Sequence, residues 1–226
     1  MARAAERGME KPPESGSLHF TVPLEPISVQ ASSARIRKAK KGIQSHLPST
    51  QFLLSGDVSI EIEWWIHEAD RYESAAAVDV DNILKPLLDV LCGPGALLID
   101  DNQVQSVRCS WIDWTSHGQA VDLQIRFRTD EFVQKDELVF VEIEKSLCMP
   151  INRGLPPKFL TVLLDAFQWQ FDQRRLWQGR GYDYYQSKGF MSIQRVFHTS
   201  RLQQFEVLSL AAMRREIARR SAASGT

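Results

Sequence analysis

Residues 78–104 read VDVDNILKPLLDVLCGPGALLIDDNQV, and this stretch decides the fold prediction for the first half of the chain. Apolar side chains recur there at helical spacing from residue 80 to residue 92. The residues that make this pattern are Ile83, Leu84, Leu87, Leu88 and Leu91. Gly93, Pro94 and Gly95 end the helix, since glycine and proline both disfavour its continuation. The stretch therefore predicts a helix over residues 80–92 and an acidic turn before the next strand.

Alternating segments on both sides of this helix predict the strands of one sheet. Residues 57–66 read DVSIEIEWWI, in which Val58, Ile60 and Ile62 face one side and the residues between them the other. Similar patterns predict strands over residues 18–24, 104–112 and 121–127, and a basic segment predicts a helix over residues 34–47. This order describes a mixed α/β domain, a small sheet packed with helices, over residues 17–131. The polar residues 1–16 are expected to form a disordered tail.

The remainder, residues 132–226, predicts a mainly helical C-terminal extension. One alternating strand is expected over residues 138–143, a long amphipathic helix over 155–177 and a last helix over 201–220. Between the two helices, residues 179–189 read GRGYDYYQSKG, a turn-rich aromatic loop. Its three tyrosines lie beside two cations and are candidates for stacking on unpaired bases. These loop residues are Tyr182, Tyr184, Tyr185, Arg180 and Lys188.

Composition restricts the class of protein without naming a partner. The chain has 226 residues, 43% of them apolar, and a formal net charge of −1. No stretch approaches the roughly 18 to 20 consecutive apolar residues that span a bilayer, and three dispersed cysteines predict neither disulfides nor a zinc site. We therefore expect a cytoplasmic protein that does not enter a membrane. Residues 132–226 hold 14 basic and 9 acidic residues, which favours an anionic partner for that part.

Acidic residues surround the predicted helix at both ends. Asp79 and Asp81 lie at its start, where Asp81 is expected to cap the first turn, and the Asp100–Asp101 pair follows its terminating turn. Clustered carboxylates repel one another unless a cation lies between them. Magnesium prefers such oxygen ligands, together with water and phosphate oxygens. Lys85, four residues after Asp81, could stabilise negative charge on a phosphate.

Helix chemistry alone offers a second interpretation of some of these residues. An acidic helix start and Asp–Lys–Asp spacing at Asp81, Lys85 and Asp89 stabilise a helix without any further function. Capping accounts for neither Asp79 nor the Asp100–Asp101 pair, and these residues favour the metal site.

The motif DVDNILK, followed by LLDVL and IDDNQV, resembles the signature of the RusA family of Holliday-junction resolvases. The resemblance extends over roughly residues 18–130. It implies the RusA-like fold and a homodimeric, Mg²⁺-dependent endonuclease, in which Mn²⁺ can substitute, that cuts branched DNA in recombination and repair. It also implies that Asp79, Asp81 and Asp101 bind the metal ion and take part in catalysis with Lys85. Asp100 holds the first place of the acidic pair, which the resemblance implies is the less essential one. The turn before this pair is about one residue longer than in the family, which leaves the choice between Asp100 and Asp101 open.

The sequence departs from this family in the charge that precedes the motif. Residues 67–78 read HEADRYESAAAV, in which Arg71 is the only fixed positive charge. DNA binding needs several cations, and the expected helix over residues 34–47 supplies candidates: Arg35, Arg37, Lys38, Lys40 and Lys41. A solvated helix face is the alternative interpretation of that cluster.

Two other functions remain open. The low positive charge near the acidic motif suits a catalytically weak DNA-binding or regulatory protein on a RusA-like scaffold. A phosphatase or glycosyl transferase could also hold a metal ion with the D-x-D motif, but residues 75–78 make a poor strand and Asn82 does not fit the phosphatase pattern.

Overall fold

The computed structural model describes residues 8–26, 30–74, 79–115, 118–191 and 194–223. The chain divides into two compact units, Met1–Phe132 and Val133–Thr226. Residues 1–7 of the expected disordered tail lie outside the described residues.

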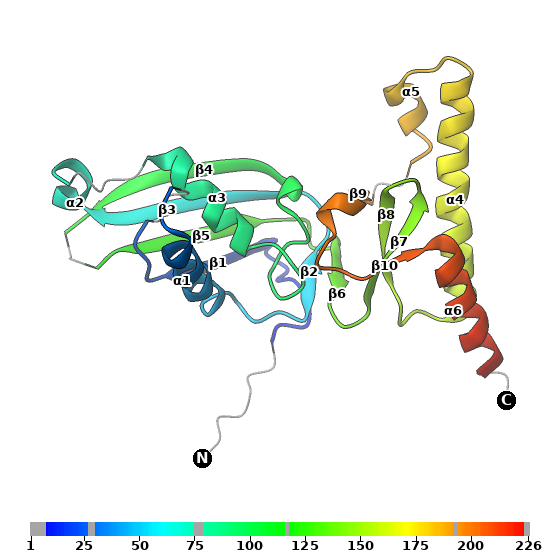
Figure 1. Cartoon of the computed structure of the whole chain (residues 1–226), viewed down its shortest axis with the longest axis horizontal. Coiled ribbons are helices and arrows are strands. Elements are labelled where there is room, and N and C mark those ends of the chain that lie inside the picture. The colour runs from blue at the N-terminus through cyan, green and yellow to red at the C-terminus, as the bar shows by residue number, and fades with distance from the viewer. Residues whose placement is uncertain (1–7, 27–29, 75–78, 116–117, 192–193, 224–226) are drawn as a thin grey trace. The chain divides into compact units, whose positions relative to one another are not determined.

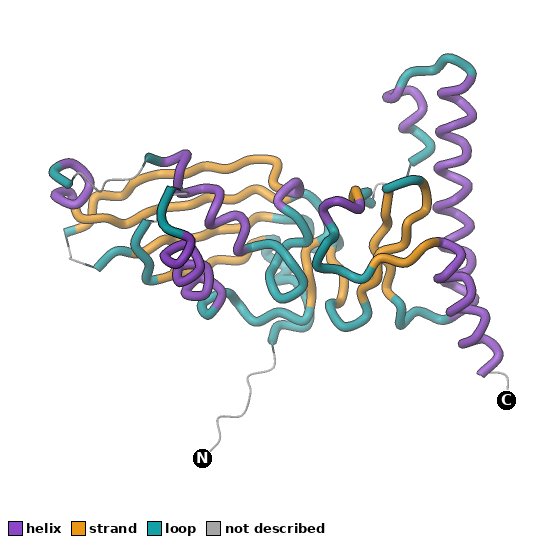
Figure 2. The backbone as a smooth tube through the Cα atoms, viewed as in Figure 1, coloured by secondary structure: helices purple, strands orange, loops and turns teal. Residues whose placement is uncertain are grey.

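The first unit is built on a four-stranded sheet with the order β1-β5-β3-β4 (Figure 2). The strands are β1 (Ser17–Val22), β3 (Val58–His67), β4 (Val104–Trp114) and β5 (Ala120–Arg126). Strands β3 and β4 are parallel, whereas β5 is antiparallel to both β1 and β3. Alternate residues of β3 are buried and partly exposed, which confirms the strand and the period of two predicted from its sequence.

Two helices cover one face of this sheet, α1 (Ser33–Gln44) and α3 (Val80–Val90) (Figure 1). Ile83 and Leu87 of α3 are buried in one cluster with Ile60 and Ile62 of β3. Ile43 of α1 joins the same cluster, so the apolar side of each helix faces the sheet. The short helix α2 (Glu68–Tyr72) and the 3-10 turn η1 (Asp101–Gln103) complete the crossover from β3 to β4.

Two short strands in this part of the chain were not predicted. They are β2 (Phe52–Leu54) and β6 (Phe132–Gln134), and the ring of Phe132 packs edge-on against Phe52. Part of the expected tail is also held in place, because the main chain of Met9 makes hydrogen bonds to Ser49 and Gln51. Strands β2 and β6 were not predicted because three residues show too little alternation for a strand to be recognised from the sequence.

The second unit contains a four-stranded sheet with the order β10-β7-β8-β9, and helices α4 and α6. Its apolar core joins Val139 and Val141 of the sheet to Leu164 and Phe171 of α4. The elements are β7 (Leu138–Glu144), β8 (Leu147–Asn152), α4 (Pro157–Gly179), α5 (Tyr184–Lys188), β9 (Phe197–His198), η2 (Thr199–Arg201), β10 (Val207–Ser209) and α6 (Leu210–Ala223).

The strand over residues 138–143 and the long helix are confirmed, whereas two details of this part were wrong. The last helix begins at Leu210 rather than Arg201, because residues 207–209 pair with β7 as a parallel strand. Strand β8 was missed because it contains Pro150. Proline is tolerated there because the facing residue of β7, Phe140, directs its N–H away from β8. That N–H donates to the carbonyl oxygen of Glu206. No helix among the described residues is long and apolar enough to cross a membrane.

Candidate active site

The first turn of α3 presents two carboxylates. Asp79 is the N-cap residue, but its side chain makes no capping hydrogen bond, and Asp81 is exposed within the first turn. The prediction that Asp81 is the cap was therefore wrong, because the cap position falls two residues earlier. Both carboxylates lie at the positive end of the helix dipole, where negative charge is favoured.

Lys85 is held between two carboxylates from different elements. Its Nζ lies 2.6 Å from Oδ1 of Asp89, one turn further along α3, and 2.9 Å from Oδ2 of Asp101 in η1. The Lys85 side chain is nevertheless 59% exposed, so that its ammonium group can still meet a ligand. The hydrogen bonds that Lys85 donates, first to Asp89 and then to Asp101, raise its pKa above the ordinary value, which keeps the side chain charged.

Asp89 links this pair to the basic helix α1. Its Oδ2 lies 3.0 Å from Nζ of Lys40. Burial would raise the pKa of Asp89, but hydrogen bonds from Lys85 and Lys40 outweigh burial and lower it. The result is an alternating ion-pair network, Lys40–Asp89–Lys85–Asp101, which joins α1, α3 and η1. Lys40 was predicted to bind DNA, which stays a prediction, and its ammonium group contacts Asp89.

The side chain of Gln103 holds the turn that carries Asp100 and Asp101 in place. Its side chain is fully buried, and its Nε2 donates to the carbonyl oxygens of Leu54 and Gly56 at 2.9 and 2.8 Å. Its Oε1 accepts hydrogen bonds from the N–H groups of Ile99 and Asp100 at 2.8 and 3.0 Å. The turn that carries the two acidic residues is thus fastened to the loop between β2 and β3.

Sequence reasoning missed this role of Gln103 and misjudged Asp100. The Asp100 carboxylate accepts the N–H of Asn102 at 3.0 Å, and with Gln103 it forms a capping box. Capping therefore does account for Asp100, contrary to the expectation. The D-x-x-Q spacing of a capping box was the signal in the sequence that could have identified both residues.

The donor chemistry of these residues suits a hard cation. Asp79 and Asp81 offer carboxylate oxygens that are not used to cap α3, and Mg²⁺ commonly takes one or two carboxylates together with water and phosphate oxygens. Among the residues described, no three acidic, histidine or cysteine side chains form a ready-made metal cage. A site that closes around the ion through all three of Asp79, Asp81 and Asp101 stays a prediction.

The remaining cations predicted to bind DNA lie along the exposed side of α1. Arg37, Lys38 and Lys41 are exposed, and Arg35 lies 3.5 Å from Glu25 in a solvent-exposed pair. Because α1 packs beside α3 and Lys40 contacts Asp89, this basic surface is adjacent to the Lys85 network.

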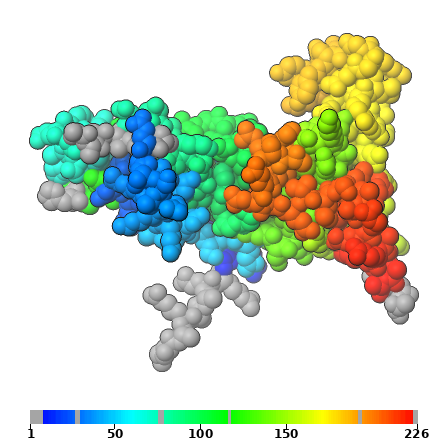
Figure 3. All heavy atoms as spheres, in the orientation of Figure 1, coloured from blue at the N-terminus to red at the C-terminus, as the bar shows by residue number. Residues whose placement is uncertain are grey.

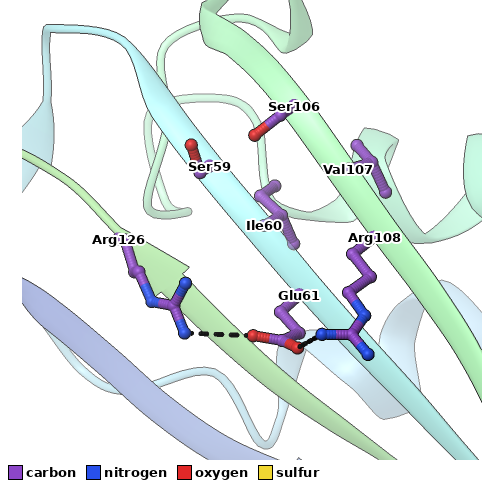
Figure 4. Close-up of a pocket in the computed structure, with 7 residues that line it drawn as sticks. All are labelled: Ser59, Ile60, Glu61, Ser106, Val107, Arg108 and Arg126. Carbon is purple, nitrogen blue, oxygen red and sulfur yellow. Dashed lines mark hydrogen bonds and ion pairs between the residues drawn. The ribbon is translucent and has the colours of Figure 1, made fainter.

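A pocket of about 180 Å³ is lined by residues of β3, β4 and β5, which Figure 4 shows. Glu61 stands at its centre, and its carboxylate oxygens are each 3.1 Å from a guanidinium nitrogen, one of Arg108 and one of Arg126. Glu61 alternates with the buried Ile60 and Ile62, so it points away from α3. The pocket is therefore separate from the acidic turn, and its one carboxylate and two guanidinium groups leave a net positive charge.

Comparison with known families finds a match over this unit. The family model described as Endodeoxyribonuclease RusA matches residues 4–126, more than half of the chain. The match contains the sheet, α1, α3, the acidic turn and Lys85, and it leaves the second unit outside. Comparison with curated proteins finds no match. The chain belongs to the RusA family of endodeoxyribonucleases.

Proposed function

We propose that this protein is a magnesium-dependent endonuclease that cuts branched DNA, with four-way Holliday junctions as its substrate in recombination and repair. The observation that carries this proposal is the network around Lys85. An exposed ammonium group is fixed between Asp89 and Asp101, inside the region that matches the family. Such preorganised charge is what phosphodiester hydrolysis requires, because negative charge accumulates on the phosphate.

The acidic residues and Lys85 would have different roles in this reaction. Asp79, Asp81 and Asp101 would hold Mg²⁺, or Mn²⁺ in its place, with Asp100 as the alternative to Asp101. The bound ion would act as a Lewis acid and lower the pKa of a water molecule. Lys85 would stabilise the negative charge that develops on the phosphate, and Asp89 would hold Lys85 in position.

Exposed cations of α1 would bring the DNA to this site. Arg37, Lys38 and Lys41 lie on the helix that Lys40 joins to the network, so a phosphate backbone that follows α1 would pass close to Lys85. A branched junction has near two-fold symmetry, and a homodimer would present one such site to each of two opposing strands.

Replacement of Asp81 tests the proposal. We expect Asp81→Asn to lower Mg²⁺-dependent cleavage of a four-way junction by about a hundredfold or more, because the variant keeps the shape of the side chain but not its charge. Junction binding without metal should be retained. Asp136→Asn removes an exposed carboxylate of the second unit and serves as the control. Undiminished cleavage by Asp81→Asn would exclude this metal site.

A second function has its own supporting observation. Among the described residues no ready-made metal cage is present, and Asp101 is already paired with Lys85. A catalytically weak DNA-binding or regulatory protein on the same scaffold fits these facts. Tight junction binding with no cutting at any concentration of Mg²⁺ or Mn²⁺ would favour this alternative, whereas cutting by the wild type would exclude it.

A further inference from the structure

The second unit carries exposed aromatic rings where α4 turns into α5. Tyr182, Tyr184 and Tyr185 are 46%, 54% and 80% exposed. Figure 1 shows α5 beside the C-terminal end of α4, and in Figure 3 the yellow atoms of this segment stand at the surface. This segment lies outside the residues that match the family, and the proposed cleavage site makes no use of it.

Trp177 of α4 gives the segment a fixed shape. Its ring stacks on Phe190 with the centroids 5.7 Å apart and the planes nearly parallel, and Tyr182 meets it edge-on at 5.0 Å. Ser187 is fully buried and donates a hydrogen bond to the carbonyl of Tyr184. Gly181 has φ +91, a conformation that glycine adopts without strain, and it allows the tight turn. The tyrosines are thus presented by a packed structure.

Tyr184 and Tyr185 form the outermost part of this surface. Their rings meet edge to face with centroids 5.5 Å apart. This edge-to-face arrangement leaves ring faces open to solvent, and the Tyr185 side chain is accordingly 80% exposed. An open tyrosine face is flat, rigid and amphipathic, and a nucleobase can stack on it whatever its sequence.

The charges around these rings favour a polyanion. Arg180 and Lys188 are both exposed, and within the described part of the chain neither forms an ion pair with a carboxylate. The guanidinium of Arg180 lies over the Trp177 ring, 5.0 Å from its centroid, and keeps its charge available to an anion. Asp183, the one acidic residue of this segment, is occupied in capping α5 through the N–H of Gln186. Two such cations, one before and one after the exposed tyrosines along the chain, suit the alternating phosphates and bases of a single strand.

We propose that Tyr184 and Tyr185, with Arg180 and Lys188, form a binding site for unpaired nucleotides of DNA. The rings stack on bases, and the two cations contact the phosphates that connect them. The site holds single-stranded or unpaired segments in preference to duplex, since paired bases are already stacked on one another. Binding here is independent of cleavage at the acidic turn, and it goes beyond the nuclease function proposed above.

The test measures binding of the full-length chain to a short fluorescein-labelled oligo-dT in EDTA, by fluorescence anisotropy. We expect Tyr184→Ala combined with Tyr185→Ala to weaken binding by about tenfold or more, because stacking on two rings is removed. The double Phe variant should bind as the wild type does, and the double Leu variant should be as weak as the Ala variant. Both rings are exposed, so the variants should fold, and circular dichroism verifies this.

The contribution of charge has its own measurement. Replacing Arg180 and Lys188 by Gln should lower the affinity for oligo-dT. The salt dependence is measured as the slope of log K against the logarithm of the salt concentration. This slope should become less steep by roughly 0.7 for each phosphate that the protein no longer neutralises. Oligo-dT affinity that is unchanged in the Ala double variant would overturn the proposal. Full binding by the Leu variant would also overturn it, because a leucine side chain offers no ring face on which a base can stack. Because Asp81→Asn leaves this site intact, loss of cleavage and loss of single-strand binding are separate outcomes.

Discussion

The most stringent test of the site's construction is the replacement of Gln103 by Leu. This change keeps a side chain of similar size in a fully buried position and removes the amide. Four main-chain groups are then without their partner: the carbonyl oxygens of Leu54 and Gly56, and the N–H groups of Ile99 and Asp100. The turn that carries Asp101 is no longer tied to the loop after β2.

The magnitude follows from the number of hydrogen bonds. A net contribution of about 1 kcal/mol for each bond gives a decrease of about 4 kcal/mol in the free energy of unfolding. Partners left unsatisfied in the interior would increase this effect, and water that enters the site would reduce it. A protein of ordinary stability, about 5 to 15 kcal/mol, would lose a large part of its margin.

Urea denaturation followed by circular dichroism measures this decrease, and hydrogen exchange localises it. The amides of Ile99 and Asp100 should become unprotected first, since Gln103 is their acceptor. Gln105→Leu is the matched control, because Gln105 is exposed two residues further on and loses only a surface hydrogen bond to Asp57, so it should change stability by about 1 kcal/mol or less. If both variants unfold at the same urea concentration and the two amides stay protected, the role assigned to Gln103 is refuted.

Two further predictions concern pH. The pKa of Asp89 is lowered, so its ion pairs stabilise the fold above the ordinary aspartate pKa of about 3.9 and are lost as the pH falls through the lowered value. Asp89→Asn should therefore be less stable than the wild type at pH 7, by at most about 1 kcal/mol because the pairs are partly exposed to solvent. The two proteins should become equal in urea denaturation at strongly acidic pH, and a difference that persists there would contradict this. Burial, and then the charges of Asp101 and Asp100, raises the pKa of Cys92 to about 12. Alkylation of Cys92 by iodoacetamide, followed by mass spectrometry, should be slow at pH 8 and keep accelerating above pH 10, whereas a plateau near pH 9 would show an ordinary thiol.

The sequence by itself was sufficient for features that depend on neighbouring residues. Alternation over residues 57–66 predicted the strand β3, and helical spacing over residues 80–92 predicted α3. The motif around Asp79 and Asp101 predicted the family that the match over residues 4–126 shows. These signals are local, because the periods of strands and helices are set by residues a few positions apart.

Only the tertiary structure decided which side chains meet across the chain. Gln103 finds its acceptors at Leu54 and Gly56, nearly fifty residues earlier, and Lys40 reaches Asp89 across a similar separation. No spacing rule connects such residues, since their contact depends on how α1, α3 and the sheet pack together. Strand β10 was missed for the same reason: a three-residue segment becomes a strand through its pairing with β7, a partner that local pattern does not identify.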